Sequence, residues 1–208
     1  PRLGSHRSPE PWTCALVSLT TFSDHAALRL LTLAPHAFFL KQKRVHREVG
    51  LTRETYKSLA AKAAAEVREL LPWDLDRLQR AEPRLLVLDV RERSEFEQAH
   101  IKGSLNVPRG ILEAACEYDY AETEPELVAA RDRPVVVVCR SGNRSALAAL
   151  VMRLLGYENV ASLKLGIKGW NDGDLPLVDC RGVTVDGDDA AHLIEPKIAP
   201  EQRDPSRR

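Results

Sequence analysis

The stretch VVVVCRSGNRSALAALVMRLLG, residues 135–156, carries the strongest signal for the fold. Its four valines form a short apolar run without alternation, which is typical of a strand covered on both faces in a parallel sheet. Cys139 ends the run, a polar turn with Gly142 follows, and the apolar residues from about Arg144 to Gly156 predict a buried helix. A buried strand that turns directly into a buried helix indicates an α/β domain.

Strands and helices alternate on both sides of this stretch. A second buried strand is predicted at residues 85–88 (LLVL), directly before Asp89. Because such alternation forms a doubly wound parallel sheet, we expect a domain over residues 67–178 with Asp89 and Cys139 at its ligand-binding edge. The other expected elements are a lead helix at 51–66, a last helical turn or short strand at 66–70, helices at 72–80, within 94–100 and within 109–130, short strands at 104–108 and 159–163, and a helix at 167–171.

The two ends of the chain differ from this central domain. Residues 1–50 form an N-terminal extension of unknown structure, and residues 179–208 are polar with little periodicity, so we expect a flexible tail there. The apolar stretch at residues 26–40 is too short to span a membrane and lacks a signal-peptide cleavage pattern. We therefore expect a cytoplasmic protein, in which its thiols stay reduced.

The composition argues against two classes of partner and against a bound metal. Lys and Arg together number 30, as do Asp and Glu, so the formal net charge is zero, and neither nucleic acid nor a membrane is expected as a partner. The chain has no CxxC pair, which argues against a zinc or redox-dithiol site, and no cofactor or metal is expected. Its four cysteines are Cys14, Cys116, Cys139 and Cys180.

The turn after Cys139 has the features of an anion-binding site. Successive backbone N–H groups in a tight turn, with a helix N-terminus behind them, bind anions and push a neighbouring thiol toward thiolate. Arg140 and Arg144 flank the turn, and cations at a helix N-terminus oppose the helix dipole unless an anion sits between them. The alternative is an ordinary buried cysteine followed by a solvent-exposed turn.

The segment CRSGNRS at residues 139–145 resembles the active-site loop of rhodanese-like single-domain sulfurtransferases. Three further pieces of that family, LLVLDVRERSEF, HIKGSLNVP and GIKGW, occur in the family's order between residues 85 and 170. The resemblance implies a five-stranded parallel sheet with helices on both faces. It also implies that Cys139 takes sulfane sulfur from thiosulfate or a related donor and passes it to a thiol or cyanide acceptor.

The resemblance also implies roles for individual residues. Cys139 is the expected nucleophile and persulfide carrier, and the two arginines of the loop are candidates for holding an anionic donor. The expected substrate-binding loop consists of Arg140, Ser141, Gly142, Asn143 and Arg144.

Several other residues of the family's motifs are expected to be structural. Asp89 and Arg91 match the LDVR piece, where a strand-end carboxylate paired with arginine is favoured over a place at the rim of the active site. His100 is expected to be a hydrogen-bonded structural residue. The Gly166-x-x-Gly169 spacing, in place of the family's double glycine, has no interpretation from the sequence.

Two other functions remain open at this point. Tyrosine-type phosphatases that share this fold use a Cys-x5-Arg loop, whereas Cys139 and Arg144 form a shorter Cys-x4-Arg loop, which favours sulfur over phosphate. The domain could also be a persulfide carrier or interaction module that receives sulfur from a donor protein and turns over small donors slowly. Cys180 is a candidate partner thiol, although an ordinary thiol is the favoured interpretation.

Overall fold

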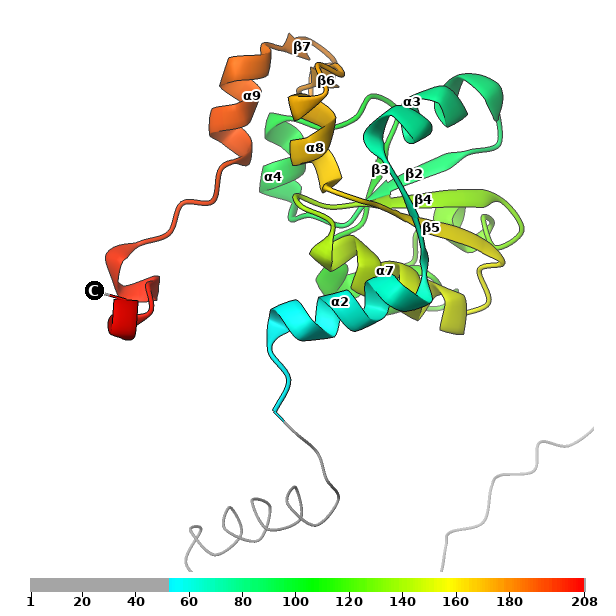
Figure 1. Ribbon diagram of the computed structural model, residues 1–208. Helices are drawn as coiled ribbons and strands as arrows, with labels where there is room; N and C mark the ends of the chain where they lie inside the picture. The colour runs from blue at the N-terminus through cyan, green and yellow to red at the C-terminus, as the bar shows by residue number, and fades with distance from the viewer. Residues whose placement is uncertain (1–52, 208) are drawn as a thin grey trace, which may run out of the picture. The chain divides into compact units, whose positions relative to one another are not determined.

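Five parallel strands form the central sheet of the computed structural model, which describes residues 53–207 (Figure 1). The strand order is β1-β5-β4-β2-β3, so β4, the strand before Cys139, lies at the centre. Helices cover both faces, and the predicted five-stranded α/β fold is confirmed. The strands are β1 (Arg68–Leu70), β2 (Leu86–Asp89), β3 (Leu105–Asn106), β4 (Pro134–Val138) and β5 (Asn159–Leu163).

The unbroken apolar runs reflect a sheet that is buried on both sides. Val135 and Val137 point into the core beneath one helical layer, whereas Val136 and Val138 point into the core beneath the other. Successive side chains of a strand point to opposite faces, so both sets have to be apolar. Cys139 continues the alternation on the side of Val137.

One layer consists of α2 (Tyr56–Glu66), α5 (Leu112–Ala115), α6 (Pro125–Val128) and α7 (Asn143–Leu154). The predicted lead helix is α2, which packs along α7. The buried face of α7 is rich in alanine, and such small side chains let neighbouring elements approach closely. The other layer contains α3 (Pro72–Ala81), α8 (Gly166–Asp172) and α9 (Gly187–Ile194), with the segment that follows α4 (Arg93–Gln98).

Residues 179–195 are folded, whereas the sequence predicted a flexible tail. The short strands β6 (Leu177–Val178) and β7 (Thr184–Val185) pair antiparallel, and α9 follows them. The Asp186 carboxylate caps α9 by accepting hydrogen bonds from two backbone N–H groups. Only Ala190 and Ile194 of α9 are buried, in the same core cluster as Trp170, and so small an apolar face leaves little periodicity in the sequence. The helical turns η3 (Pro200–Gln202) and η4 (Pro205–Arg207) follow.

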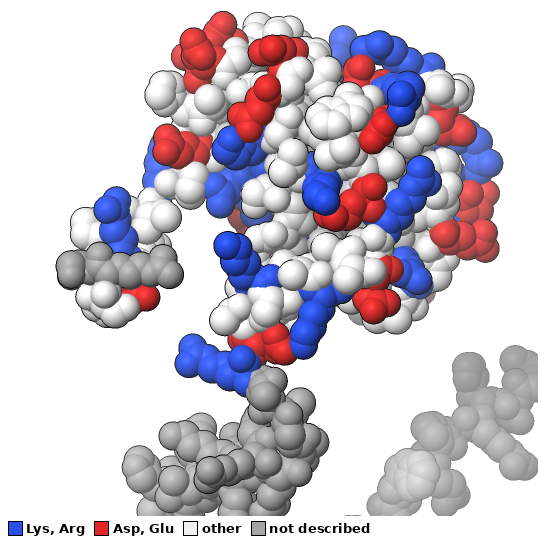
Figure 2. Space-filling view, viewed as in Figure 1, with Lys and Arg blue, Asp and Glu red and all other residues white. Residues whose placement is uncertain are grey.

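Three remaining points concern the N-terminal extension, membrane spanning and the distribution of charge. The predicted extension at residues 1–50 lies outside the described residues. Between residues 53 and 207, no helix combines the length and apolarity that a bilayer crossing requires. Acidic and basic side chains are interspersed over the visible face of the molecule (Figure 2), in keeping with the zero formal net charge.

The packing of α9 predicts a loss of stability for Ile194→Ala. The Ile194 side chain is 6% exposed, so its truncation is expected to lower the free energy of unfolding by about 2 kcal/mol. Leu193→Ala is the matched control on the same helix, because Leu193 is 41% exposed and its truncation should change stability by less than about 0.5 kcal/mol. Urea unfolding measures both, and equal stabilities of the two variants would mean that α9 is not docked.

Candidate active site

The sulfur of Cys139 lies inside the turn between β4 and α7. The residue is 1% exposed, and the backbone N–H of Gly142 donates a hydrogen bond to Sγ at 3.2 Å. Gly142 adopts a left-handed conformation with φ of +97° and is the N-cap residue of α7. The start of α7 therefore lies directly against the thiol, as the sequence predicted for this strand, turn and helix.

Two buried serines extend the polar contacts of this sulfur. The Cys139 thiol lies 3.5 Å from Ser145 Oγ, to which it donates, and Ser145 Oγ donates to the Gly142 carbonyl at 2.9 Å. Ser162 on β5 donates to Ser145 Oγ at 2.9 Å. Sequence reasoning missed both serines. Their signal was a hydroxyl directly before the apolar segment ALAALVM on α7 and another within the apolar segment VASL on β5.

The first turn of α8 holds the other side of the loop. The backbone N–H groups of Ile167 and Lys168 donate to the carbonyls of Cys139 at 2.9 Å and of Arg140 at 3.0 Å. Gly166 makes this approach possible, because a Cβ at that position would lie 2.3 Å from the Cys139 carbonyl oxygen. Its φ of +58° also favours glycine. The GIKGW motif therefore anchors the active-site loop through its backbone.

The second glycine of that motif has a steric explanation. Leu165 adopts a left-handed conformation with φ of +67°, which is rare for a leucine. A Cβ on Gly169 would lie 2.4 Å from the Leu165 Cβ, so only glycine leaves room for this leucine. In the Gly166-x-x-Gly169 spacing, Gly166 therefore allows the close contact with the active-site loop, and Gly169 leaves space for the Leu165 side chain.

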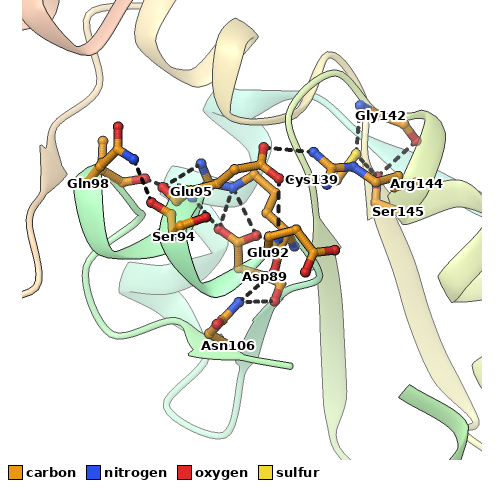
Figure 3. Close-up of polar contacts among 12 residues, drawn as sticks. Asp89, Glu92, Ser94, Glu95, Gln98, Asn106, Cys139, Gly142, Arg144 and Ser145 are labelled. Carbon is orange, nitrogen blue, oxygen red and sulfur yellow. Dashed lines mark hydrogen bonds and ion pairs between the residues drawn. The ribbon is translucent and has the colours of Figure 1, made fainter. Parts of the chain in front are cut away.

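Arg144 is engaged by a carboxylate from α4 (Figure 3). Its Nη1 and Nη2 atoms donate to the Glu95 carboxylate at 2.8 and 2.9 Å. The hydrogen bonds with Glu95 raise the pKa of Arg144. Burial alone would raise the pKa of Glu95, but the hydrogen bonds and charge of Arg144 outweigh it, and the net shift is downward. Arg144 therefore ties the loop to α4.

Asp89 and Arg91 hold α4 in place for that contact. Their side chains are 2% and 3% exposed and form an ion pair at 2.7 Å at the carboxyl end of β2. Arg91 also donates to the backbone carbonyls of Glu95 at 3.2 Å and Ala99 at 2.7 Å. The Arg91 guanidinium thus joins the end of β2 to the backbone of α4, which supports the structural role that the sequence favoured over an active-site rim.

Arg140 has a different environment from Arg144. Among residues 53–207, its side chain forms no hydrogen bond or ion pair, although its carbonyl is fixed by α8. The same holds for the side chains of Ser141 and Asn143 in the described part of the chain. Within residues 53–207, Arg140 is therefore the arginine of the loop whose guanidinium has no hydrogen-bond or ion-pair partner.

Two other titratable side chains, Tyr56 and His100, are candidates for a part in the site because of their position or their motif. Tyr56 opens α2, and its pKa is raised mainly by partial burial, while the charges of Arg144 and Arg140 act in the opposite direction. His100 Nδ1 lies 2.9 Å from the Phe96 carbonyl, and its ring stacks on Phe96, as a structural histidine does.

The other cysteines of the described region lie in different surroundings. Cys116 is fully buried, and burial raises the pKa of its thiol, which disfavours the reactive thiolate form. Cys180 is exposed. Within residues 53–207, no three His, Cys, Asp or Glu side chains gather as ligands for a metal ion.

These features define a class of α/β proteins with a cysteine at the end of the central strand and a polar loop that leads into a helix. The profile of the rhodanese-like domain matches residues 72–173. The Escherichia coli K12 protein YibN, itself uncharacterized, is 33% identical over 130 residues, which cover 62% of this chain and 82% of YibN. The chain belongs to the rhodanese-like family.

Two further comparisons concern a named relative and a solved structure of similar fold. A Schizosaccharomyces pombe protein named "Putative thiosulfate sulfurtransferase, mitochondrial" is 30% identical over 125 residues, which cover 59% of this chain and 88% of that protein. The solved structure of a Rhodopseudomonas palustris protein of unknown function, described as a possible tyrosine phosphatase, superimposes with a TM-score of 0.55 at 26% identity. The match covers 61% of this chain and 96% of that one.

The contact between Gly166 and the loop predicts a large effect of Gly166→Ala. The new Cβ would clash with the Cys139 carbonyl, so we expect a loss of about 3 kcal/mol in the free energy of unfolding, from overpacking and backbone strain together. Gly103→Ala is the matched control, because Gly103 also has a positive φ but nothing lies within 4 Å of its new Cβ. It should lose only about 1 kcal/mol. Equal losses on urea unfolding would contradict the proposed close packing.

The ion pair between Glu95 and Arg144 predicts a pH-dependent contribution to stability. Because the pKa of Glu95 is lowered from 4.5 in the folded state, its charge stabilises the fold above pH 4.5 and the gain disappears as the pH falls through the folded-state value. Glu95→Gln should therefore be less stable than the wild type at pH 7, by about 1 kcal/mol or less, and this gap should shrink as the pH falls below 4.5. Glu122→Gln removes an exposed glutamate with no ion pair in the described region and should show no such pH dependence. A gap for Glu95→Gln that stays constant with pH would rule out the ion pair as its cause.

Proposed function

We propose that this protein is a sulfurtransferase that moves sulfane sulfur through a persulfide on Cys139. The donor is thiosulfate or a related persulfide, and the acceptor is a thiol or cyanide. The observation that carries the proposal is the position of the Cys139 sulfur, at the end of the central strand and within hydrogen-bond distance of the Gly142 N–H group. Membership of the rhodanese-like family and a relative named for thiosulfate sulfurtransferase support it.

The proposed reaction has two balanced steps. In the first, the Cys139 thiolate attacks the outer sulfur of thiosulfate, a sulfur–sulfur bond forms on Cys139, and the bond within thiosulfate breaks with its electron pair leaving on sulfite. In the second, the acceptor thiolate or cyanide attacks the outer sulfur of the persulfide. The persulfide bond breaks, and its electron pair returns to Cys139.

The loop supplies the electrostatic support for both steps. The Gly142 N–H group stabilises negative charge on Sγ, and the helix N-terminus of α7 adds to this effect. The remaining loop residues, Ser141 and Asn143, complete the cradle. We assign the contact with an anionic donor to Arg140, because Arg144 is already bound to Glu95 and acts on the site through its charge and its hold on the loop.

Phosphate transfer is less well supported, although one similar solved structure is described as a possible tyrosine phosphatase. Four residues separate Cys139 from Arg144, one fewer than in the phosphatase loop, which leaves a smaller cradle. Moreover, an arginine can bind a phosphate through both Nη atoms only if neither is bound to another group. Both Nη atoms of Arg144 donate hydrogen bonds to the Glu95 carboxylate.

A persulfide carrier in a sulfur relay is the second candidate. The observation in its favour is the 1% exposure of Cys139, which restricts exchange of its sulfur with solutes in bulk water. In this role, the domain would receive sulfur from a donor protein and release it only to a relay protein. Both roles need a reduced Cys139, which a reducing compartment such as the cytoplasm maintains.

Mass spectrometry of the intact chain after exposure to thiosulfate tests the proposal. The wild type should gain the mass of one sulfur atom and release sulfite, whereas Cys139→Ser should do neither, because it lacks the nucleophile. Cys180→Ser is the matched control for the exposed thiol and should behave as the wild type.

Turnover then separates the two roles. With cyanide present, an enzyme continues to release sulfite far beyond one equivalent of protein, whereas a carrier stops after the first. Sulfur uptake by Cys139→Ser at the wild-type rate would remove Cys139 from the mechanism.

A further inference from the structure

A chain of two buried hydroxyl groups leads from β5 to the sulfur of Cys139. Ser162 Oγ donates a hydrogen bond to Ser145 Oγ at 2.9 Å, and Ser145 Oγ lies 3.5 Å from Sγ. Both serines are 0% exposed. A hydroxyl in such a place has no contact with bulk water, so the protein itself has to provide its hydrogen-bond partners.

The sheet register places Ser162 on the same side of the sheet as the cysteine. Ser162 of β5 is paired with Val137 of β4, which lies two residues before Cys139. Paired residues of neighbouring strands share a face, as do side chains two residues apart on one strand. Val137 and Cys139 belong to the core cluster beneath α7, so Ser162 projects toward that helix and meets Ser145 in its first turn.

The Ser145 hydroxyl uses its full hydrogen-bonding capacity while Cys139 is a thiol. A hydroxyl has one hydrogen to donate and two lone pairs that accept. Ser145 Oγ accepts from Ser162 and from the Cys139 thiol. Its own hydrogen goes to the Gly142 carbonyl at 2.9 Å (Figure 3). That carbonyl also accepts from the backbone N–H of Ala146 at 3.0 Å, so it keeps a partner when the Ser145 hydrogen turns elsewhere.

We infer that Ser145 is a catalytic residue that turns its hydrogen to the Cys139 sulfur when the thiol becomes a thiolate, and that Ser162 positions it. A thiolate no longer donates, and a hydrogen bond to a charged sulfur is stronger than one to a neutral carbonyl. Throughout this change, the Ser162 hydroxyl keeps donating to Ser145 Oγ and holds that oxygen beside Sγ. The inference rests on the proposed function, because it assigns residues to the nucleophile of that reaction.

The same hydroxyl supports both steps of the proposed sulfur transfer. In the first step, Cys139 loses its proton to the solvent, and Ser145 donates to the thiolate that attacks the donor. In the second step, the acceptor attacks the outer sulfur, the persulfide bond breaks and its electron pair returns to Sγ. The Gly142 N–H group and the Ser145 hydroxyl then both donate to the charged sulfur.

Alkylation of Cys139 by iodoacetamide, followed by peptide mass spectrometry, tests this contact without any sulfur transfer. A thiolate with one hydrogen bond fewer forms at higher pH but is intrinsically more nucleophilic. Ser145→Ala should therefore react about threefold more slowly than the wild type at acidic pH, where little thiolate is present, and about threefold faster on the alkaline plateau. The charged and titratable side chains around the sulfur, Arg140, Arg144 and Tyr56, are the same in every variant.

Discharge of the persulfide-loaded protein by cyanide tests the second step. Ser145→Ala should be discharged about threefold more slowly than the wild type, because the leaving sulfur has lost a donor. Ser162→Ala should show a smaller effect in the same direction, and none when it is added to Ser145→Ala, since Ser162 acts through Ser145. Ser104→Ala is the matched control and should behave as the wild type, because the Ser104 hydroxyl also donates to a backbone carbonyl, that of Ile101 at 2.6 Å.

The double variant also separates loss of the contact from loss of the fold. Ser145→Ala leaves the Ser162 hydroxyl without its acceptor, whereas the double variant removes both members of the pair. Identical alkylation profiles for the wild type, Ser145→Ala and the double variant would overturn the inference. An effect of Ser162→Ala that persists in the Ser145→Ala background would contradict the positioning role of Ser162. A wild type that accepts no sulfur would instead refute the proposed function, and the alkylation profiles would still decide the role of Ser145.

Discussion

The hydrogen bonds from the first turn of α8 to the carbonyls of Cys139 and Arg140 are the constraint on which the site depends. They fix the backbone of the proposed nucleophile, Cys139, and of Arg140 beside it. They also require Gly166, because any side chain at that position would displace the Cys139 carbonyl. A loop held by its carbonyls on one side presents the Gly142 N–H group to the sulfur on the other. The chemistry proposed for Cys139 therefore depends on a helix that begins 27 residues later in the chain.

Arg140 and Arg144, the two arginines of the active-site loop, lie in different surroundings. Arg144 is bound by Glu95 of α4, and α4 is held by the buried pair of Asp89 and Arg91. Arg140 faces a pocket next to α8 and α9 without a protein partner in the described region. A buried ion pair fixes one group in one place because leaving either partner alone would expose an uncompensated buried charge. The buried pair thus positions α4, and through Glu95 it fixes Arg144 at the active-site loop.

Much of the fold and the centre of the site could be predicted because they depend on local sequence. The runs at residues 85–88 and 135–138 became β2 and β4 within one residue at each end, and the apolar stretch after Arg144 became α7. The roles of Ser145 and Ser162 could not be predicted, because their contact joins positions 17 residues apart. The partner of Arg144 lies 49 residues away in the chain, which no local pattern indicates.

The sequence alone therefore determined the class of fold, the position of Cys139 at a strand end and the membership of a family, because burial pattern and loop motif are properties of short segments. Tertiary structure alone decided which loop arginine has an ion-pair partner within residues 53–207, why Gly166 is needed, and that α9 is packed rather than flexible. These outcomes depend on which distant segments meet across the sheet edge. A helix such as α9, with two buried residues in eight, leaves too weak a pattern for its docking to be read from composition.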